Sequence, residues 1–194
     1  LRHLTRYRKS VVHDITAQKN RIDKFLQSSG FRFTAFLSDA FGASGRNIIR
    51  HLIEHGSIDR AVLDKCLKTK TRNRIDEILI ALNGSLSVHQ RRFLNMVFQH
   101  LEDLETHKRT VEDEITEEVL KHTEALNLLC SIPGIDVTAA AAILAETGTD
   151  MSSFPDSQHI CSWAGLSPGN NESAGKRKSV HINKGNPYLK SMLC

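Results

Sequence analysis

Residues 87–115 read SVHQRRFLNMVFQHLEDLETHKRTVEDEI and begin the longest helix that the sequence predicts. Ser87 is followed three residues later by Gln90, a capping box that predicts the start of a helix. Apolar residues then recur at intervals of three and four over three heptads, with Lys108 as the one polar interruption: Leu94, Val97, Leu101, Leu104, Val111 and Ile115. We therefore expect one long helix over about residues 88–129.

Residues 1–29 carry a similar pattern and predict a second long helix, which ends at Gly30. Its apolar residues form a heptad seam that Arg8 and Gln18 interrupt: Leu4, Val11, Ile15, Ile22 and Phe25. Between the long helices the sequence predicts three short ones, over residues 45–55, 58–68 and 74–82, with Ser44 and Ser57 capping the first two.

Two long heptad helices that flank a short-helix insert favour an antiparallel coiled coil, which a second copy of the chain completes as a homo-oligomer. The alternative is a pair of ordinary amphipathic helices on a compact bundle. At Pro133-Gly134 the sequence becomes richer in Gly, Ser, Asn and Pro. We expect an all-α fold with a coiled-coil and linker region over residues 1–125, a possible dimerisation stem, and a small carboxy-terminal domain over residues 126–194.

Composition excludes several classes of protein. The 194 residues are 40% hydrophobic and 25% charged, which excludes disordered, collagen-like and disulfide-scaffold proteins. The longest apolar stretch, residues 137–145, is far shorter than the roughly 20 residues of a membrane span. The four cysteines form no Cys-x-x-Cys pair, so we expect reduced thiols, no metal site and a cytoplasmic protein that makes no membrane contact.

The net charge of +4 is unevenly distributed along the chain. Residues 1–24 hold seven Lys or Arg against two acids, and residues 156–194 hold five against two. Residues 101–118 hold eight acids against two bases. This distribution favours phosphate contact at the two ends and a solvated acidic stretch between them.

Residues 128–140 read LLCSIPGIDVTAA and predict a helix-hairpin-helix, a motif that contacts nucleic-acid backbone without reading sequence. Gly134 permits the tight turn, and the backbone N–H groups at Gly134 and Ile135 are the candidate phosphate donors. Asp136 stands where such turns often carry a second glycine, and its carboxylate repels phosphate unless it caps the helix. The alternative is a purely structural turn.

Residues 163–179, WAGLSPGNNESAGKRKS, predict a loop in which three consecutive bases follow a serine. Attack on a phosphodiester needs an exposed hydroxyl and cations near the developing charge, which Ser173 and Lys176, Arg177 and Lys178 provide. A solvated basic loop explains the same composition. The spacing of Gly169 and Gly175 does not fit a nucleotide-binding P-loop.

Five segments together resemble one known family: residues 132–135 (IPGI), 154–155 (FP), 162–166 (SWAGL), 168–176 (PGNNESAGK) and 184–186 (KGN). They are similar to the carboxy-terminal transposase domain of the insertion-sequence 110/116/902 family, the DEDD-type transposases. The resemblance covers about residues 120–194. The preceding helical region, including residues 39–46, resembles the coiled-coil middle of the family with less specificity.

The resemblance implies a site-specific recombinase of a mobile element, with DNA as substrate and an element-encoded bridge RNA as guide. It implies a serine nucleophile, which falls by motif on Ser173, whereas Ser167 is a weaker candidate. It also implies four metal-binding acids for Mg²⁺ in an amino-terminal RNase H-type domain. That domain is missing from this sequence, so we expect a fragment, truncated within its last domain, that holds no cofactor and does not recombine DNA alone.

From the residues and the resemblance, the nucleic-acid-binding candidates are Gly134, Ile135, Lys176, Arg177, Lys178 and Lys184. Two other functions stay open beside the transposase. One is a non-enzymatic helix-hairpin-helix module with a dimerising coiled coil, which predicts binding without a role for any serine. The other is a helical scaffold for protein contacts.

Overall fold

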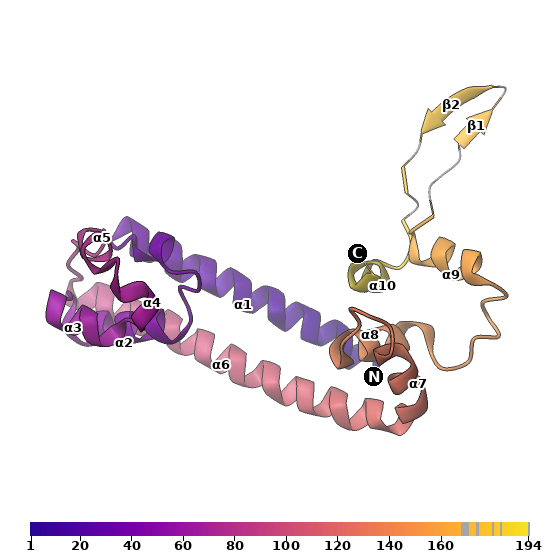
Figure 1. The fold of residues 1–194 in the computed structure, drawn as a ribbon, viewed down its shortest axis with the longest axis horizontal. Coiled ribbons are helices and arrows are strands. Elements are labelled where there is room, and N and C mark those ends of the chain that lie inside the picture. The colour runs from indigo at the N-terminus through magenta and orange to yellow at the C-terminus, as the bar shows by residue number, and fades with distance from the viewer. Residues whose placement is uncertain (168–170, 174, 180, 183, 194) are drawn as a thin grey trace. The chain divides into compact units, whose positions relative to one another are not determined.

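The computed structural model describes residues 1–167, 171–173, 175–179, 181–182 and 184–193, with backbone alone for residues 69, 70, 171–173 and 176–179. Two compact units share the chain (Figure 1). Unit 1 combines Leu1–Ser10 with Lys108–Cys194, and unit 2 comprises Val11–His107.

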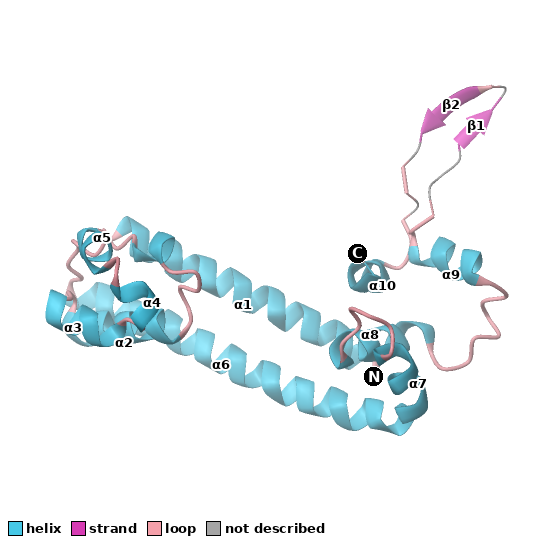
Figure 2. Cartoon of the chain, viewed as in Figure 1, coloured by secondary structure: helices cyan, strands magenta, loops and turns pink. Residues whose placement is uncertain are grey.

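Helices dominate both units (Figure 2). The elements are, in chain order, α1 (Arg2–Ser28), η1 (Phe33–Phe36), α2 (Ala43–His55), α3 (Arg60–Cys66), α4 (Thr69–Arg72), α5 (Ile75–Ile80), α6 (Val88–Val119), η2 (Leu120–His122), α7 (Thr123–Cys130), α8 (Val137–Thr147), α9 (Ser157–Ala164), β1 (Asn171–Ser173), β2 (Lys176–Ser179) and α10 (Pro187–Leu193). The predicted all-α class is confirmed, with the β1–β2 hairpin as a small addition. No helix among the described residues is both long and apolar enough to cross a bilayer.

In unit 2, α1 and α6 pack against each other in antiparallel orientation. The Gln18 side-chain amide donates to the Val97 carbonyl at 2.7 Å, and the Phe25 and Phe93 rings lie 4.9 Å apart. A later residue of α1 thus contacts an earlier residue of α6, as expected for antiparallel helices. Predicted seam residues of both helices lie in the buried core with Phe31 and Phe33: Val11, Ile15, Ile22, Leu94 and Leu101. Pairing with a second copy of the chain stays a prediction.

The polar residues that interrupt the seam have partners inside the chain. Gln18 is 2% exposed, and its side-chain oxygen accepts from Arg21. In unit 1, Arg8 pairs with Glu112 at 2.6 Å, and Lys108 lies 3.3 Å from the same carboxylate. A polar group in a seam is tolerated when its hydrogen bonds are satisfied, so these residues do not break the helices.

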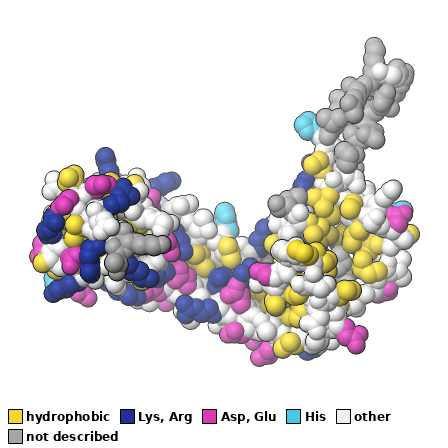
Figure 3. Space-filling view, viewed as in Figure 1, with side chains coloured by type: hydrophobic (Ala, Val, Ile, Leu, Met, Phe, Trp, Pro, Cys, Tyr) yellow, Lys and Arg dark blue, Asp and Glu magenta, His cyan; other side chains and the backbone are white. Residues whose placement is uncertain are grey.

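The charge pattern predicts that the acidic stretch over residues 101–118 is solvated. The structure differs, because two acids of α6 form ion pairs with arginines of α2. Arg46 donates to Glu105 at 2.6 Å and lies 3.8 Å from Glu102. Arg50 donates to Glu102 at 2.7 Å. Figure 3 accordingly shows side chains of both charges interspersed over unit 2.

The cap predictions are correct for the long helix and wrong for the short ones. The Ser87–Gln90 capping box is confirmed, because Ser87 N donates to Gln90 Oε1 at 2.9 Å and Gln90 N to Ser87 Oγ at 3.3 Å. Ser44 lies inside α2 and accepts from Lys68 N. Ser57 precedes α3 by three residues, and Asp59 caps that helix by accepting from Val62 N at 2.8 Å. Polar residues near a helix start compete for the cap, and tertiary packing decides between them.

The helix predicted over residues 88–129 is broken at η2. His122 leaves the helical region with φ −124° and ψ 43°, and α7 begins at Thr123. Val119 before the break and Leu126 after it both lie in one buried cluster with Ala140 and Leu144 of α8. The break thus lets two helical segments cover the same core.

The boundary predicted near residue 125 differs from the division into compact units. Leu1 and Leu4 at the start of α1 pack on the cluster that contains Val111, Ile115 and Val119 at the end of α6. The ends of both long helices therefore share a core with residues 126–194, and the units divide the chain at Ser10 and His107 instead.

Gly45 offers a test of the packing at the start of α2. A Cβ at this position lies 1.8 Å from the Ala40 carbonyl oxygen, a backbone atom that must move to make room. We expect Gly45→Ala to lower the free energy of unfolding by about 1–3 kcal/mol in urea titrations. Ser38→Ala, at an exposed position in the same unit, serves as the control and should change it by less than about 0.5 kcal/mol.

Candidate functional site

The predicted serine loop is a two-stranded antiparallel hairpin. Ser173 pairs with Lys176, and Glu172 pairs with Arg177. Gly175, in the two-residue turn between them, has φ +72°, a conformation that tight hairpin turns require and glycine adopts at little cost. The register shifts between Asn171 and Glu172, since Asn171 pairs with Ser179. Four predicted site residues thus share one hairpin, and Ser173 stands opposite a base.

The side chains of Ser173, Lys176, Arg177 and Lys178 lie outside the described part of the structure. Pro168 and Gly169, which belong to the motif that resembles the transposase family, also lie outside it. The predicted roles of the four hairpin residues as nucleophile and phosphate contacts therefore stay predictions.

The hairpin leaves the helices and returns to them at one place, which we call the hairpin base: Trp163, Gly165, Gly185 and Asn186. Gly165 ends α9 in the left-handed region with φ +75°. Gly185 packs so closely that a Cβ there lies 2.1 Å from Gly165 N. Asn186 N donates to the Trp163 carbonyl at 3.0 Å. Lys184, the predicted phosphate contact beside this base, is exposed.

Asn186 uses both ends of its side-chain amide. Its oxygen accepts from Tyr188 N at 2.9 Å and from Leu189 N at 3.1 Å, and so caps α10. Its nitrogen donates to Glu146 Oε2 at 2.7 Å. The hairpin base is therefore attached to both α10 and α8.

Glu146 is the centre of a polar cluster that none of the predicted sites includes. It is 4% exposed, and Arg6 donates to both of its carboxylate oxygens at 2.8 Å. The Arg6 guanidinium also lies 4.3 Å from the centre of the Tyr188 ring. Arg2 donates to the carbonyl groups of Ala145 and Glu146 at the end of α8. A signal was present, because Glu146 directly follows the apolar residues 137–145, where a buried acid needs a cationic partner.

The charges in this cluster stabilise one another. The hydrogen bonds from Arg6 hold the pKa of Glu146 below its ordinary value, against the opposing effect of burial, and the bond from Asn186 acts in the same direction. The hydrogen bond to Glu146 raises the pKa of Arg6. Both groups are therefore ionised at neutral pH.

The predicted helix-hairpin-helix turn joins α7 to α8. Gly134 is exposed and has φ +91°, with no atom within 4 Å of the position that a Cβ takes. Ile135 is half-buried against α7 and α8, and its N–H donates to the Ile132 carbonyl at 3.1 Å. Asp136 caps α8 by accepting from Ala139 N at 2.7 Å. The carboxylate therefore has the capping role that the sequence left open. Gly134 is the more accessible of the two predicted contacts.

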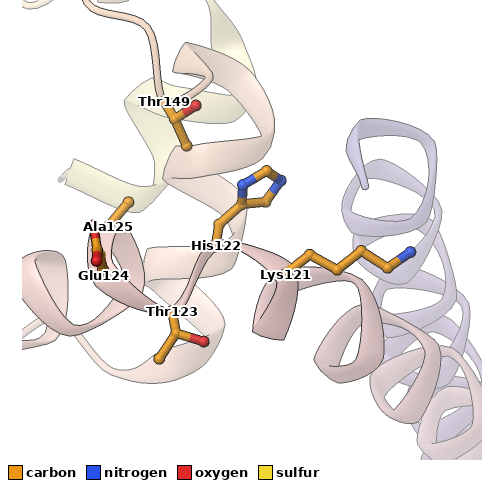
Figure 4. A pocket seen from close by; sticks show the side chains of 6 residues that line it. All are labelled: Lys121, His122, Thr123, Glu124, Ala125 and Thr149. Carbon is orange, nitrogen blue, oxygen red and sulfur yellow. The ribbon is translucent and has the colours of Figure 1, made fainter.

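A pocket of about 540 Å³ lies where η2 meets α7 (Figure 4). It is lined by Lys121, His122, Thr123, Glu124, Ala125 and Thr149. None of the predicted site residues lines it. Within the described residues, no group of three or more His, Cys, Asp or Glu side chains is placed to hold a metal ion.

The buried carboxylate predicts a specific response to acid. Because the pKa of Glu146 is lower in the folded chain than the ordinary value of 4.5, its contribution to stability is complete above that value. The contribution is lost as the pH falls through the lowered pKa of the folded state. We expect Glu146→Gln to lose about 2 kcal/mol of stability at pH 7 and to show a smaller further loss between pH 5 and 3 than the native chain, in urea titrations across this range.

Glu124→Gln, an exposed acid of the same unit, is the control and should follow the native acid response. An equal acid loss in the native chain and in Glu146→Gln contradicts the assignment.

Comparison with known proteins finds a similarity for the carboxy-terminal part of the chain. No curated protein and no solved structure matches the chain. The model of the Transposase IS116/IS110/IS902 family matches residues 126–194, which contain the turn at Gly134, the hairpin and the hairpin base. Residues 126–194 are therefore similar to the IS116/IS110/IS902 family of transposases, and the match does not extend to the helices before them.

Proposed function

We propose that this chain belongs to a site-specific DNA transposase of a mobile element in which Ser173 is the nucleophile. The family match over residues 126–194 carries the proposal, because it spans the hairpin on which Ser173 stands. The geometry supports it in one respect, since the serine pairs across the hairpin with Lys176, the first of three consecutive bases.

The reaction proposed for Ser173 is a transfer of the DNA phosphoryl group. The hydroxyl oxygen gives up its proton and forms a bond to phosphorus, while the bond from phosphorus to one deoxyribose oxygen breaks. That oxygen takes a proton and leaves as a hydroxyl. The strand stays attached to the protein as a phosphodiester of serine, which a second DNA hydroxyl can attack in turn. Lys176, Arg177 and Lys178 stabilise the negative charge that develops on the phosphoryl oxygens.

The further contacts with nucleic acid are proposed for the turn and for Lys184. The exposed Gly134 lets a phosphate approach the backbone at the start of α8, and Asp136 is occupied by its cap. DNA is the substrate, a guide (bridge) RNA is the second nucleic-acid partner, and a second copy of the chain pairs through α1 and α6. Mg²⁺ is proposed as the metal of the intact transposase.

The proposed nucleophile is tested in the intact transposase. We expect Ser173→Ala to abolish the covalent protein–DNA adduct, resolved by denaturing electrophoresis with labelled DNA, while the dissociation constant for DNA changes less than about threefold. Ser167→Ala, four residues before the hairpin, is the control and should retain the adduct. An undiminished adduct in Ser173→Ala leaves the non-enzymatic binding module as the better interpretation.

The proposed phosphate contacts are tested by the salt dependence of binding. Fluorescence anisotropy of the 194-residue chain with labelled duplex DNA measures the slope of log K against log salt. We expect the triple variant Lys176→Gln/Arg177→Gln/Lys178→Gln to reduce the slope by up to about three, roughly one for each phosphate that the hairpin no longer neutralises.

Lys65→Gln/Lys68→Gln/Arg92→Gln removes the same charge from exposed positions of unit 2 and is the matched control. Equal slopes in the two triple variants contradict a specific role of the hairpin. An absence of binding in the native chain favours the helical scaffold.

A further inference from the structure

The structure shows how the hairpin is attached to the helices that support it. Its two ends meet at the hairpin base, where Gly185 packs backbone to backbone on Ala164 and Gly165. The Asn186 N–H adds a hydrogen bond of 3.0 Å to the Trp163 carbonyl. Ser173 follows Gly165 by eight residues, so the base is the part of the helical framework nearest to the serine in the sequence.

The base is attached to α8 by the packing of Ile143 against Ala164 and Leu189, and by a hydrogen bond from Asn186 to Glu146. Asn186 alone joins the base, the start of α10 and Glu146 among the described residues, because its amide accepts on one side and donates on the other. An aspartate at this position still caps α10 but has no proton to donate to Glu146. The residue type therefore matches a position that needs both a cap and a donor.

Glu146 is itself held in a single orientation. Arg6 donates to both carboxylate oxygens, and Asn186 donates to one of them. Its 4% exposure means that water does not replace these partners freely. An apolar side chain at the end of α8 fills the same space. A carboxylate with fixed donors also fixes the position of the Asn186 amide that donates to it.

We propose that Glu146 and Asn186 are positioning residues, which orient the hairpin so that Ser173 reaches the DNA phosphate. The inference rests on the proposed function of Ser173. Attack on phosphorus requires the reacting atoms within about 3.5 Å of each other, and a displacement of about 1 Å costs on the order of 100-fold in rate. Neither residue contacts DNA, so their substitution slows adduct formation and leaves DNA affinity unchanged.

The test compares two single variants with their combination in the intact transposase. Asn186→Asp keeps the α10 cap and loses the donor, and Glu146→Gln loses the charge that Arg6 binds. In Glu146→Gln/Asn186→Asp, the glutamine amide donates to the aspartate, which restores the link to the base in the opposite direction, while Arg6 keeps one hydrogen bond to the glutamine oxygen. We expect each single variant to form the adduct about 10- to 100-fold more slowly, with the DNA dissociation constant within about threefold, and the double variant to recover at least about fivefold over the slower single variant.

Two matched controls carry the same chemical changes at exposed positions of unit 1. Glu124→Gln and Asn127→Asp should keep the native rate of adduct formation. Trp163, the single tryptophan of the 194-residue chain, provides a measurement that does not depend on catalysis. Because Trp163 belongs to the hairpin base, we expect faster quenching of its fluorescence by acrylamide in both single variants, where the side-chain link between the base and α8 is disturbed, and native quenching in the double variant.

The outcomes separate this inference from the function on which it rests. If Ser173→Ala abolishes the adduct and the single variants keep the native rate, the positioning role is wrong and the nucleophile stands. If the single variants lose the adduct only in proportion to their unfolded fraction, with no recovery in the double variant, the cluster is purely structural and the inference is wrong. If Ser173→Ala keeps the adduct, the proposed function fails, whatever the other variants do.

Discussion

The pairing of a buried carboxylate with a cation is the constraint on which unit 1 depends. Glu146 lies at the end of α8, and Arg6 of α1 binds both of its oxygens. An unpaired charge at this depth costs several kcal/mol, so the first turns of α1 must lie beside α8 for the unit to fold. Arg2 reinforces this arrangement by donating to the last carbonyl groups of α8, where a helix carries partial negative charge.

The same carboxylate connects the helical core to the part of the chain that matches the transposase family. Through Asn186 it reaches the hairpin base and the cap of α10. The three residues of the segment KGN, at positions 184–186, therefore have different roles. Lys184 is exposed, Gly185 provides the close backbone approach, and Asn186 joins three elements. A short motif thus combines one residue available to a ligand with two that packing requires.

The sequence predicts the site in part, because glycines in short motifs indicate where the backbone turns. Gly134 and Gly175 both adopt positive φ at turns that their neighbours predict. For the hairpin itself the sequence predicts only a loop, since residues 171–179 lack the alternation of apolar residues that marks a strand. The role of Glu146 escapes prediction because its partners, Arg6 and Asn186, lie 140 and 40 residues away in the sequence.

The sequence is sufficient to predict the two long helices, because heptad spacing and a capping box are local properties that α1 and α6 retain in the fold. It also determined the chemical character of the candidate site through the serine and the bases that follow it. Tertiary packing, in contrast, sets where α6 breaks, which residues cap α2 and α3, and how the two units divide the chain. It also decided the role of Glu146. Each of these outcomes depends on contacts between residues distant in sequence, which periodicity and local propensity do not encode.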